Sequence, residues 1–200
     1  MESKLMEWMK DFFVWDTKDE GNTCALKPIQ GFTKTYRLTG GMKLLEQWPE
    51  DVYFQMDPEF PRNIGLADNL QNLNRVAVIS KSLRQFLENK RLKNVEYLPV
   101  AIMNHKGKIA SRDYSIVNPI LNQDCIDIEL SKPTFYDISP GDIQYVEMFV
   151  IDPNKLDPDV QLFRPKNFEG RILIRAALAN EISAGSFTGI RWKDPLKVTS

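Results

Sequence analysis

The fold is set by one continuous stretch, which reads Arg75-Val76-Ala77-Val78-Ile79-Ser80-Lys81-Ser82-Leu83-Arg84-Gln85-Phe86-Leu87-Glu88. Its first five residues are mostly apolar and β-branched, which predicts a buried strand. Ser80 or Ser82 can then accept a backbone N–H as the N-cap of a helix. Leu83, Phe86 and Leu87 recur at helical spacing, so a helix that begins at these serines turns one face to the core.

Outward from this stretch, further segments have the length and pattern of strands. In the segment 125–130, apolar residues alternate with Asp127, Glu129 and a cysteine, which predicts a strand with one apolar and one mostly acidic face. We expect other strands over residues 12–15, 95–103, 114–117, 145–151, 162–164, 171–174 and 189–192. A second helix is expected from Arg175 to Ser183, ending near Gly185. Because the strands are grouped with few helices between them, the sequence favours an α+β fold with a mostly antiparallel sheet and a few packed helices.

The chain begins with a separate amphipathic pattern. Leu5, Trp8, Met9 and Phe12 follow the i, i+3, i+4, i+7 spacing, which predicts a helix near residues 2–12. Its polar face mixes both charge signs, whereas helices that bind membrane surfaces are rich in Lys and Arg. We therefore expect this helix to pack on the protein's own core.

The composition is that of an ordinary globular domain. Of the 200 residues, 42% are hydrophobic, and 26 basic against 27 acidic side chains give a net charge of −1. A dedicated nucleic-acid-binding protein usually carries an excess of basic charge, so this balance argues against one. The chain has no repeat and no low-complexity linker, and residues 1–200 are expected to form a single domain.

Charge is distributed unevenly along the chain. Residues 75–110 hold 8 basic and 2 acidic side chains, whereas residues 111–160 hold 3 basic and 10 acidic ones. Such asymmetry says little about the fold. It affects which partners a protein meets and how quickly it meets them.

Two cysteines and one histidine limit the chemistry that the sequence offers. Cys24 and Cys125 cannot build a structural zinc site with His105 alone. No secretory signal is recognisable, so we expect both thiols to be free. No apolar window is long enough to span a membrane. The expected setting is the reducing cytoplasm, without membrane association.

The search for catalytic motifs is also negative. His105 lies in the polar stretch 103–108, which is typical of a turn between strands and is a poor place to orient an imidazole base. Gly40 and Gly41 lack the spacing of a phosphate-binding loop. Prolines interrupt the acidic segment 152–159, where a calcium loop needs a regular pattern of ligands. We expect no catalytic centre, no cofactor and no metal.

One enzyme hypothesis stays open at this point. Asp127 and Glu129, on one face of the predicted strand, could hold a metal or transfer protons in a small carboxylate- or metal-dependent hydrolase. The polar outer face of a half-exposed sheet would produce the same pattern.

Six short segments stand in an order that resembles a known family. They are Val76-Ala77-Val78-Ile79-Ser80-Lys81-Ser82-Leu83, Asn94-Val95-Glu96-Tyr97-Leu98-Pro99-Val100, Tyr114-Ser115-Ile116-Val117-Asn118-Pro119, Cys125-Ile126-Asp127-Ile128-Glu129-Leu130-Ser131, Leu162-Phe163-Arg164 and Thr188-Gly189-Ile190-Arg191. Together they resemble immunity family eleven of bacterial polymorphic toxin systems, first described as a domain of unknown function. The resemblance covers about residues 50–192. Trp192 stands where the pattern has Phe, and the N-terminal helix lies outside the match.

The resemblance implies a function without catalysis. Proteins of this family are assigned as immunity proteins, each encoded beside a toxin that it binds to protect the producing cell and its kin. Membership would imply a cytoplasmic protein whose partner is a cognate toxin, with no cofactor. Interfaces in such systems diverge with the toxin, so the motif residues are expected to be structural.

If the toxin is a basic protein, the acidic stretch 111–160 is the expected docking surface. The candidate partner-binding residues are carboxylates on the acidic strand face or in loops beside it, namely Asp124, Asp127, Glu129, Asp137 and Asp142. A third hypothesis is a self-associating module, a homodimer in which an exposed Trp48 is a contact.

Overall fold

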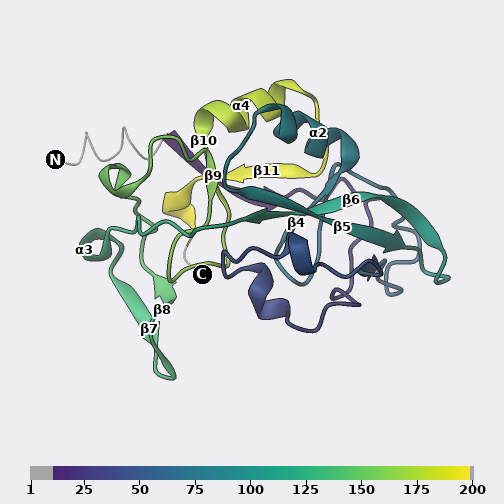
Figure 1. The fold of residues 1–200 in the computed structure, drawn as a ribbon, viewed down its shortest axis with the longest axis horizontal. Coiled ribbons are helices and arrows are strands. Elements are labelled where there is room, and N and C mark those ends of the chain that lie inside the picture. The colour runs from purple at the N-terminus through teal and green to yellow at the C-terminus, as the bar shows by residue number, and fades with distance from the viewer. Residues whose placement is uncertain (1–10, 199–200) are drawn as a thin grey trace.

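In the computed structural model, which describes residues 11–198, the stretch that opens the sequence analysis forms a strand followed directly by a helix (Figure 1). Strand β4 covers Ala77–Ser80 and helix α2 covers Lys81–Asn89. Ser80 is the N-cap, and its Oγ accepts a hydrogen bond from the Leu83 backbone N at 3.3 Å. Leu83 and Leu87 are fully buried, so the predicted capping signal and apolar face are both confirmed.

Strand β4 belongs to a five-stranded sheet with the order β2-β5-β6-β4-β3. Neighbouring strands run antiparallel except β2 and β5, which are parallel. The strand predicted over 95–103 is confirmed in full, and the one over 114–117 is part of a longer strand. The remaining strands of this sheet are β2 (Tyr53–Gln55), β3 (Asn69–Leu70), β5 (Val95–Met103) and β6 (Ile109–Pro119).

A four-stranded antiparallel sheet joins the two ends of the described chain. Strand β1 (Phe12–Thr17) lies between β10 (Leu173–Arg175) and β11 (Ile190–Lys193), and β9 (Leu162–Phe163) pairs with β10. The short strands predicted at both ends of the sequence are therefore confirmed. Residues 2–10 of the predicted N-terminal helix lie outside the described residues.

Helices α2 and α4 (Ala176–Ala184) lie side by side over the place where the two sheets meet (Figure 1). One cluster of buried side chains there combines Trp15 of β1, Ile79 of β4 and Leu178 of α4. Helix α4 ends at its C-cap Gly185, as predicted. The chain has the predicted α+β fold with mostly antiparallel pairing, although three sheets share the strands where one was expected.

The outer faces of the two sheets are covered by irregular segments. The five-stranded sheet packs on the region between Cys24 and Met56, which contains the short 3-10 helices η2 (Thr35–Leu38) and η3 (Leu45–Gln47). The four-stranded sheet packs on buried residues from the segment 125–168; the 3-10 helix η4 (Pro153–Lys155) lies in this segment but buries no residue. A last turn, η5 (Pro195–Lys197), follows β11.

Two strand predictions were wrong. Residues 125–130 and 145–151 are not continuous strands, and only a single bridge pairs Ile126 with Ile151 among the residues described. Helix α3 (Ile128–Ser131) begins within the first segment, and strand β8 (Ser139–Val146) ends within the second. Both segments contribute buried side chains to the cluster under the four-stranded sheet, so burial in a core explains their apolar residues without a strand.

Candidate interaction surface

Strands β7 (Pro133–Tyr136) and β8 form an antiparallel hairpin that projects from the lower left of the molecule (Figure 1). Within residues 11–198, these strands belong to a two-stranded sheet of their own. Ile138, at the turn between them, is 95% exposed. Large hydrophobic side chains with substantial exposure continue along the hairpin and its flanks, at Ile128, Leu130, Phe135, Tyr136, Tyr145 and Met148.

The base of this hairpin is fixed to the body. Ile143 and Val146 are buried in the cluster under the four-stranded sheet. The Ile143 backbone N donates to the Asn167 carbonyl at 2.8 Å, and the Glu147 backbone N donates to the Ser131 carbonyl at 3.1 Å. The hairpin is therefore anchored at its base while its tip and outer apolar side chains face solvent.

The structure places three of the predicted partner-binding carboxylates around α3. Asp124 and Glu129 are exposed, and Asp127 is half-buried. Asp127 does not lie on a strand face as predicted, because its Oδ1 caps α3 by accepting from the Leu130 backbone N at 3.0 Å. The alternation of acidic and apolar residues over 125–130 fits a short helix that begins after Asp127 as well as it fits a strand. The side chain of Asp127 stabilises the helix by capping its first turn.

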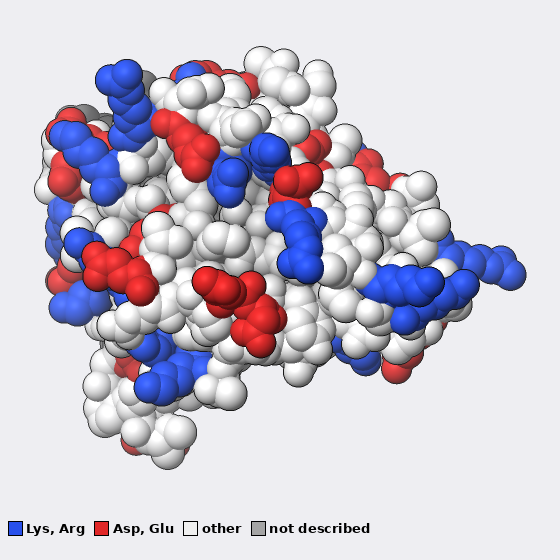
Figure 2. Space-filling view, turned by 45° about the vertical axis from the view of Figure 1, so that its right-hand side comes forward, with Lys and Arg blue, Asp and Glu red and all other residues white. Residues whose placement is uncertain are grey.

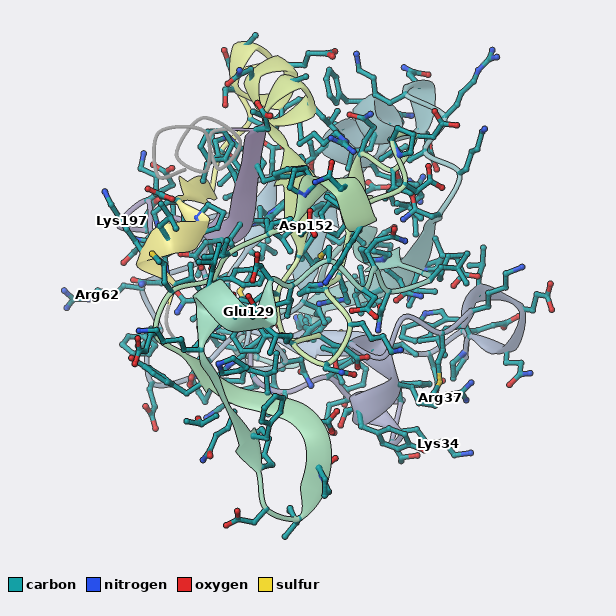
Figure 3. All side chains as sticks on the ribbon, turned by 90° about the vertical axis from the view of Figure 1, so that its left-hand side faces the viewer. Lys34, Arg37, Arg62, Glu129, Asp152 and Lys197 are labelled. Carbon is teal, nitrogen blue, oxygen red and sulfur yellow. The ribbon has the colours of Figure 1, made fainter. Side chains whose placement is uncertain are left out.

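The other two predicted carboxylates belong to the hairpin. Asp137 lies at its turn and Asp142 lies on β8, and both are exposed. The Asp142 carboxylate accepts a hydrogen bond from the Ser139 hydroxyl. In Figure 3, the labelled Glu129 lies on α3 directly above the hairpin, so the α3 and hairpin carboxylates occupy one side of the molecule. We call α3 and the hairpin, residues 124–148, the hairpin surface.

The carboxylates of the hairpin surface are mostly uncompensated. Within the described chain, none of the five predicted residues forms an ion pair, and the nearby pair is Lys132 with Glu147 at 3.0 Å. In Figure 2, the projecting hairpin at the lower left is largely uncharged with a little red, and basic side chains lie just above it as well as at the right-hand end of the molecule. The hairpin surface thus combines apolar side chains with free negative charge.

The apolar part of this surface was missed in the sequence analysis. Phe135 and Tyr136 precede a turn rich in Asp, Ser, Pro and Gly, and Tyr145 follows it. Aromatic residues on both sides of such a turn are the signature of a β-hairpin, which was available in the sequence.

The two cysteines are free, as predicted, and both are buried. Burial raises the pKa of the Cys24 thiol to about 11 and that of the Cys125 thiol to about 12. Neither thiol is therefore set up as a nucleophile, because reactivity needs a lowered pKa and access to solvent.

His105 lies in the turn between β5 and β6, as predicted, but it is half-buried. Its Nε2 lies 3.0 Å from the Asp57 carbonyl oxygen. The imidazole thus fastens the turn to a neighbouring loop, and no nucleophile lies among its hydrogen-bond partners in the described residues.

Trp48 is not the exposed contact that the dimer hypothesis needs. Its side chain is half-buried against the cluster under the five-stranded sheet, and its ring lies 4.8 Å from that of Phe32. The indole Nε1 donates to the Pro99 carbonyl at 2.8 Å. Trp48 is therefore part of the packing of the loop that carries it.

The carboxylates proposed for a hydrolase are not gathered into a site. Within residues 11–198 no group of three or more His, Cys, Asp or Glu side chains could hold a metal ion. The Asp127 carboxylate serves as a helix cap, and the Glu129 side chain points away from the body toward solvent. The geometry gives the hydrolase hypothesis no positive support.

The motif residues tie separate parts of the fold together. Asp68 accepts hydrogen bonds from the Ser80 hydroxyl and from the Thr188 backbone N and hydroxyl, which links α2 to the segment before β11. Glu96 accepts from the Asn118 side chain across the five-stranded sheet and from the Leu44 backbone N. The Asn94 side chain donates to the Leu162 carbonyl at 2.8 Å.

The third residue of the segment Leu162-Phe163-Arg164 has a similar structural role. Arg164 is fully buried, and its guanidinium donates to the carbonyl oxygens of Leu38, Glu169 and Arg171. Burial lowers its pKa to about 10, partly offset by Glu169. These contacts agree with the expectation that the motif residues are structural.

No helix in the described residues is both long and apolar enough to cross a membrane. A comparison with curated proteins finds no match to the chain. A comparison with protein families finds a match over residues 15–197 to the Immunity protein family (Imm11). This match covers nearly the whole chain and includes the five-stranded sheet, most of the four-stranded sheet, helices α2 and α4 and the hairpin surface. The chain therefore belongs to the Immunity protein family (Imm11).

Proposed function

We propose that the chain is a cytoplasmic immunity protein that binds the protein toxin encoded by a neighbouring gene and neutralises it as a complex. Its family supports the immunity role and, with it, a role that is not enzymatic. The whole chain 1–200 would act as one binding domain. The observation that carries the binding site is the hairpin surface, where large apolar side chains stay exposed beside unpaired carboxylates.

The composition of the hairpin surface is that of a protein interface. Exposed Tyr, Phe and Met side chains are enriched at the centres of interfaces, with polar residues at the rim. Ile138 and Tyr136 stand at the turn, where a partner can reach them from several sides. Contiguous exposed apolar side chains on a single chain commonly mark such a contact. A partner that covers them removes apolar area from water and stabilises the complex.

The charge of the hairpin surface favours a basic partner. Residues 124–148 hold 6 acidic side chains and 1 basic one, and the carboxylates around α3 are free of ion pairs within the described residues. Opposite charge raises the association rate, more strongly at low salt than at high salt. We therefore propose that the toxin presents a basic surface to Asp124, Asp127, Glu129, Asp137 and Asp142.

The central test is binding to the product of the neighbouring toxin gene. The two proteins should form a complex of defined stoichiometry on co-expression, and the host should survive toxin expression only with this chain present. Ile138→Asp places a charge at the turn of the hairpin and should weaken binding by about 2 kcal/mol or more, roughly 30-fold, if the turn is at the interface centre. Lack of a complex with the wild-type chain would refute the proposed function.

The contribution of charge is tested with a variant that keeps the α3 cap. Asp127→Asn can still accept the hydrogen bond from Leu130, and Glu129→Lys reverses an exposed charge. Together they should slow association at low salt by about 5-fold, because each rim charge contributes about 0.5–1 kcal/mol.

The matched control changes the same total charge elsewhere. Glu46 and Glu50 are exposed and lie outside the hairpin surface, and Glu46→Lys with Glu50→Gln should leave the association rate nearly unchanged. Equal slowing by both double variants would mean that net charge, rather than the hairpin surface, guides the encounter.

A further inference from the structure

The body of the molecule contains a cavity of about 520 Å³ where the two large sheets meet. Its wall is formed by Asp16 and its neighbours on β1, by Asn69 on β3, and by Arg75, Arg171 and Lys193. A smaller cavity of about 270 Å³ shares Arg75 and Arg171 with the first and extends to the base of the hairpin. The two arginines therefore stand where the cavities join.

The wall of the larger cavity carries more positive than negative charge. Arg75, Arg171, Lys193 and Lys197 line it, whereas Asp16 is its one acidic residue among those described. The carboxylate of Asp16 already forms ion pairs with Arg191 and Lys193. Despite burial, these two cations hold the pKa of Asp16 below its ordinary value.

Arg75 and Arg171 lie near three carboxylates, that of Asp16 in the wall of the larger cavity and those of Asp142 and Glu169 in the wall of the smaller one, but pair with none of them. Within residues 11–198 neither forms an ion pair. Arg171 donates one long hydrogen bond, 3.4 Å, to the Gly170 carbonyl and lies 5.8 Å from the centre of the Phe168 ring. Burial, and next the charge of Arg75, lower the pKa of the Arg171 guanidinium, and the Asp16 carboxylate partly offsets both. Two like charges are held close together in a partly enclosed space.

The backbone at Arg75 is left-handed, as it is at five other non-glycine residues of the described chain. Its φ is +55°, in the left-handed region that costs a residue with a side chain about 1–2 kcal/mol. Glycine or asparagine would relieve this cost. An arginine in this position keeps its guanidinium at the junction of the two cavities.

Two buried polar side chains complete the wall. Asn69 is 1% exposed and Trp15 is 8% exposed. Within the described residues, the Asn69 Oδ1 and the Trp15 Nε1 have no hydrogen-bond partner. Both atoms are fully buried, so they lie behind the cavity wall, and a bound molecule could reach them only if the wall moved.

We infer that this cavity binds a small molecule carrying at least two oxyanion groups, phosphate or carboxylate, with Arg75 and Arg171 as the main contacts. A guanidinium presents several N–H donors in a planar fork that matches either group, and its charge strengthens each hydrogen bond. The cavity volume falls within the range of small-molecule sites. This site needs no toxin, although the smaller cavity that shares its two arginines is also lined by Tyr136 and Asp142 of the hairpin surface.

The test is a titration of the full chain with pyrophosphate and, separately, citrate, followed by isothermal calorimetry at low salt. Saturable binding of one molecule is expected for at least one probe, with an accompanying rise in Tm. Binding of pyrophosphate alone would assign phosphate chemistry to the site, and binding of citrate alone would assign carboxylate chemistry. Absence of saturable binding of either probe at millimolar concentration would overturn the inference.

Variants separate the cavity from general surface charge. Arg171→Gln should weaken binding at least about 10-fold, since it removes a charge-assisted contact. Arg37→Gln is the matched control, because Arg37 does not line either cavity and lies across the molecule from the cavity residue Lys197 (Figure 3). Equal weakening by both variants would show that the probe senses only net charge.

A last variant separates binding from folding. Arg75→Gly relieves the left-handed backbone and the repulsion with Arg171, so the free protein should melt about 2–4 °C higher. The same variant should lose probe binding about 10-fold or more. A variant that is more stable and binds the probe as tightly as the wild type would remove Arg75 from the site.

Discussion

Two regions of the molecule start in the same way and end differently. At the β4–α2 step, Ser80 caps a nine-residue helix, and its hydroxyl also bonds Asp68. At α3, Asp127 caps a four-residue helix whose side chains at Ile128 and Leu130 are exposed. In both regions a side-chain oxygen of the N-cap residue accepts one hydrogen bond from a backbone N–H of the helix. The two regions differ in what surrounds their side chains. Those of the first region contact other parts of the protein, whereas many of those in the second are exposed to solvent.

This difference indicates which region is built for the fold and which for a partner. The residues around β4 and α2 link both sheets and the C-terminal strand through buried contacts. The hairpin surface is anchored by the buried Cys125, Ile126 and Ser131 beside α3 and by Ile143 and Val146 at the base of the hairpin, and the hairpin tip has no such anchor among the described residues. Substitutions in the first region should therefore change stability, and those in the second should change binding with little effect on stability.

The sharpest test of this contrast compares two phenylalanines. Phe163 is fully buried and lies edge-on to Phe12 with ring centres 6.0 Å apart, so Phe163→Ala should cost about 3–5 kcal/mol of unfolding free energy. Phe135 on the hairpin is 43% exposed, and Phe135→Ala should cost less than about 1 kcal/mol. Urea denaturation measures both. Similar losses would mean that the hairpin is as much a part of the core as β9.

The close approach of two segments gives the next largest effect. Gly189 has a φ of +76°, and an added Cβ would lie 2.2 Å from the Asn69 carbonyl oxygen. Gly189→Ala should therefore cost about 2–4 kcal/mol, the sum of a backbone and a steric penalty. Gly21 has a similar φ of +81° with nothing within 4 Å, so Gly21→Ala isolates the backbone penalty. Equal losses would show that Asn69 moves aside without cost.

Alkaline pH should weaken the body through its buried thiols. The pKa values of Cys24 and Cys125 are raised by burial to about 11 and about 12, so unfolding lets both ionise above about pH 9. Their stabilisation is fully present below that pH and is lost as pH rises toward 11–12. By pH 10 the unfolding free energy should have fallen by about 2–3 kcal/mol. The Cys24→Ala, Cys125→Ala double variant should show a shallower fall, and an unchanged slope would exclude the thiols as its source.

The smallest effect tests the helix cap on the hairpin surface. Asp127→Ala removes the acceptor for the Leu130 backbone N and should cost about 0.5–1 kcal/mol, whereas Asp127→Asn should cost little. Chemical denaturation of the two variants, measured side by side, gives the comparison. An equal loss for both would indicate that charge at the start of α3 matters more than the hydrogen bond.

Much of the body could be predicted because its signals are local and continuous. The apolar run before Ser80, the cap and the spacing of Leu83 and Leu87 agree with one another, and the structure follows them. The segment 125–130 carries two competing signals. Its alternation predicts a strand, whereas Asp127 can act as the N-cap of a helix, and the structure follows the N-cap. The hairpin was missed because its apolar residues are exposed, and a search for core strands passes over them.

The candidate sites differ in the same respect. The carboxylates of the hairpin surface lie within 20 residues of one another, so charge along the sequence was enough to propose them. The cavity takes its wall from Asp16, Arg75, Arg171 and Lys193, which are brought together only when the two sheets pack. No local sequence pattern predicts a cavity whose residues lie far apart along the chain, so this one is recognisable only in the folded structure.

The pairing of β1 with β10 and β11 has a consequence for the newly made protein. Phe12 pairs with Arg175, and Thr17 pairs with Ile190. The four-stranded sheet therefore cannot close until residues 175–190 have left the ribosome. At ordinary rates of synthesis this delay lasts roughly 10–30 s. Pairings so distant in sequence also fold slowly. The sheet beneath which the base of the hairpin is anchored is therefore complete only after residue 193 has been synthesised, so the hairpin lacks its support on a chain still being made up to that point.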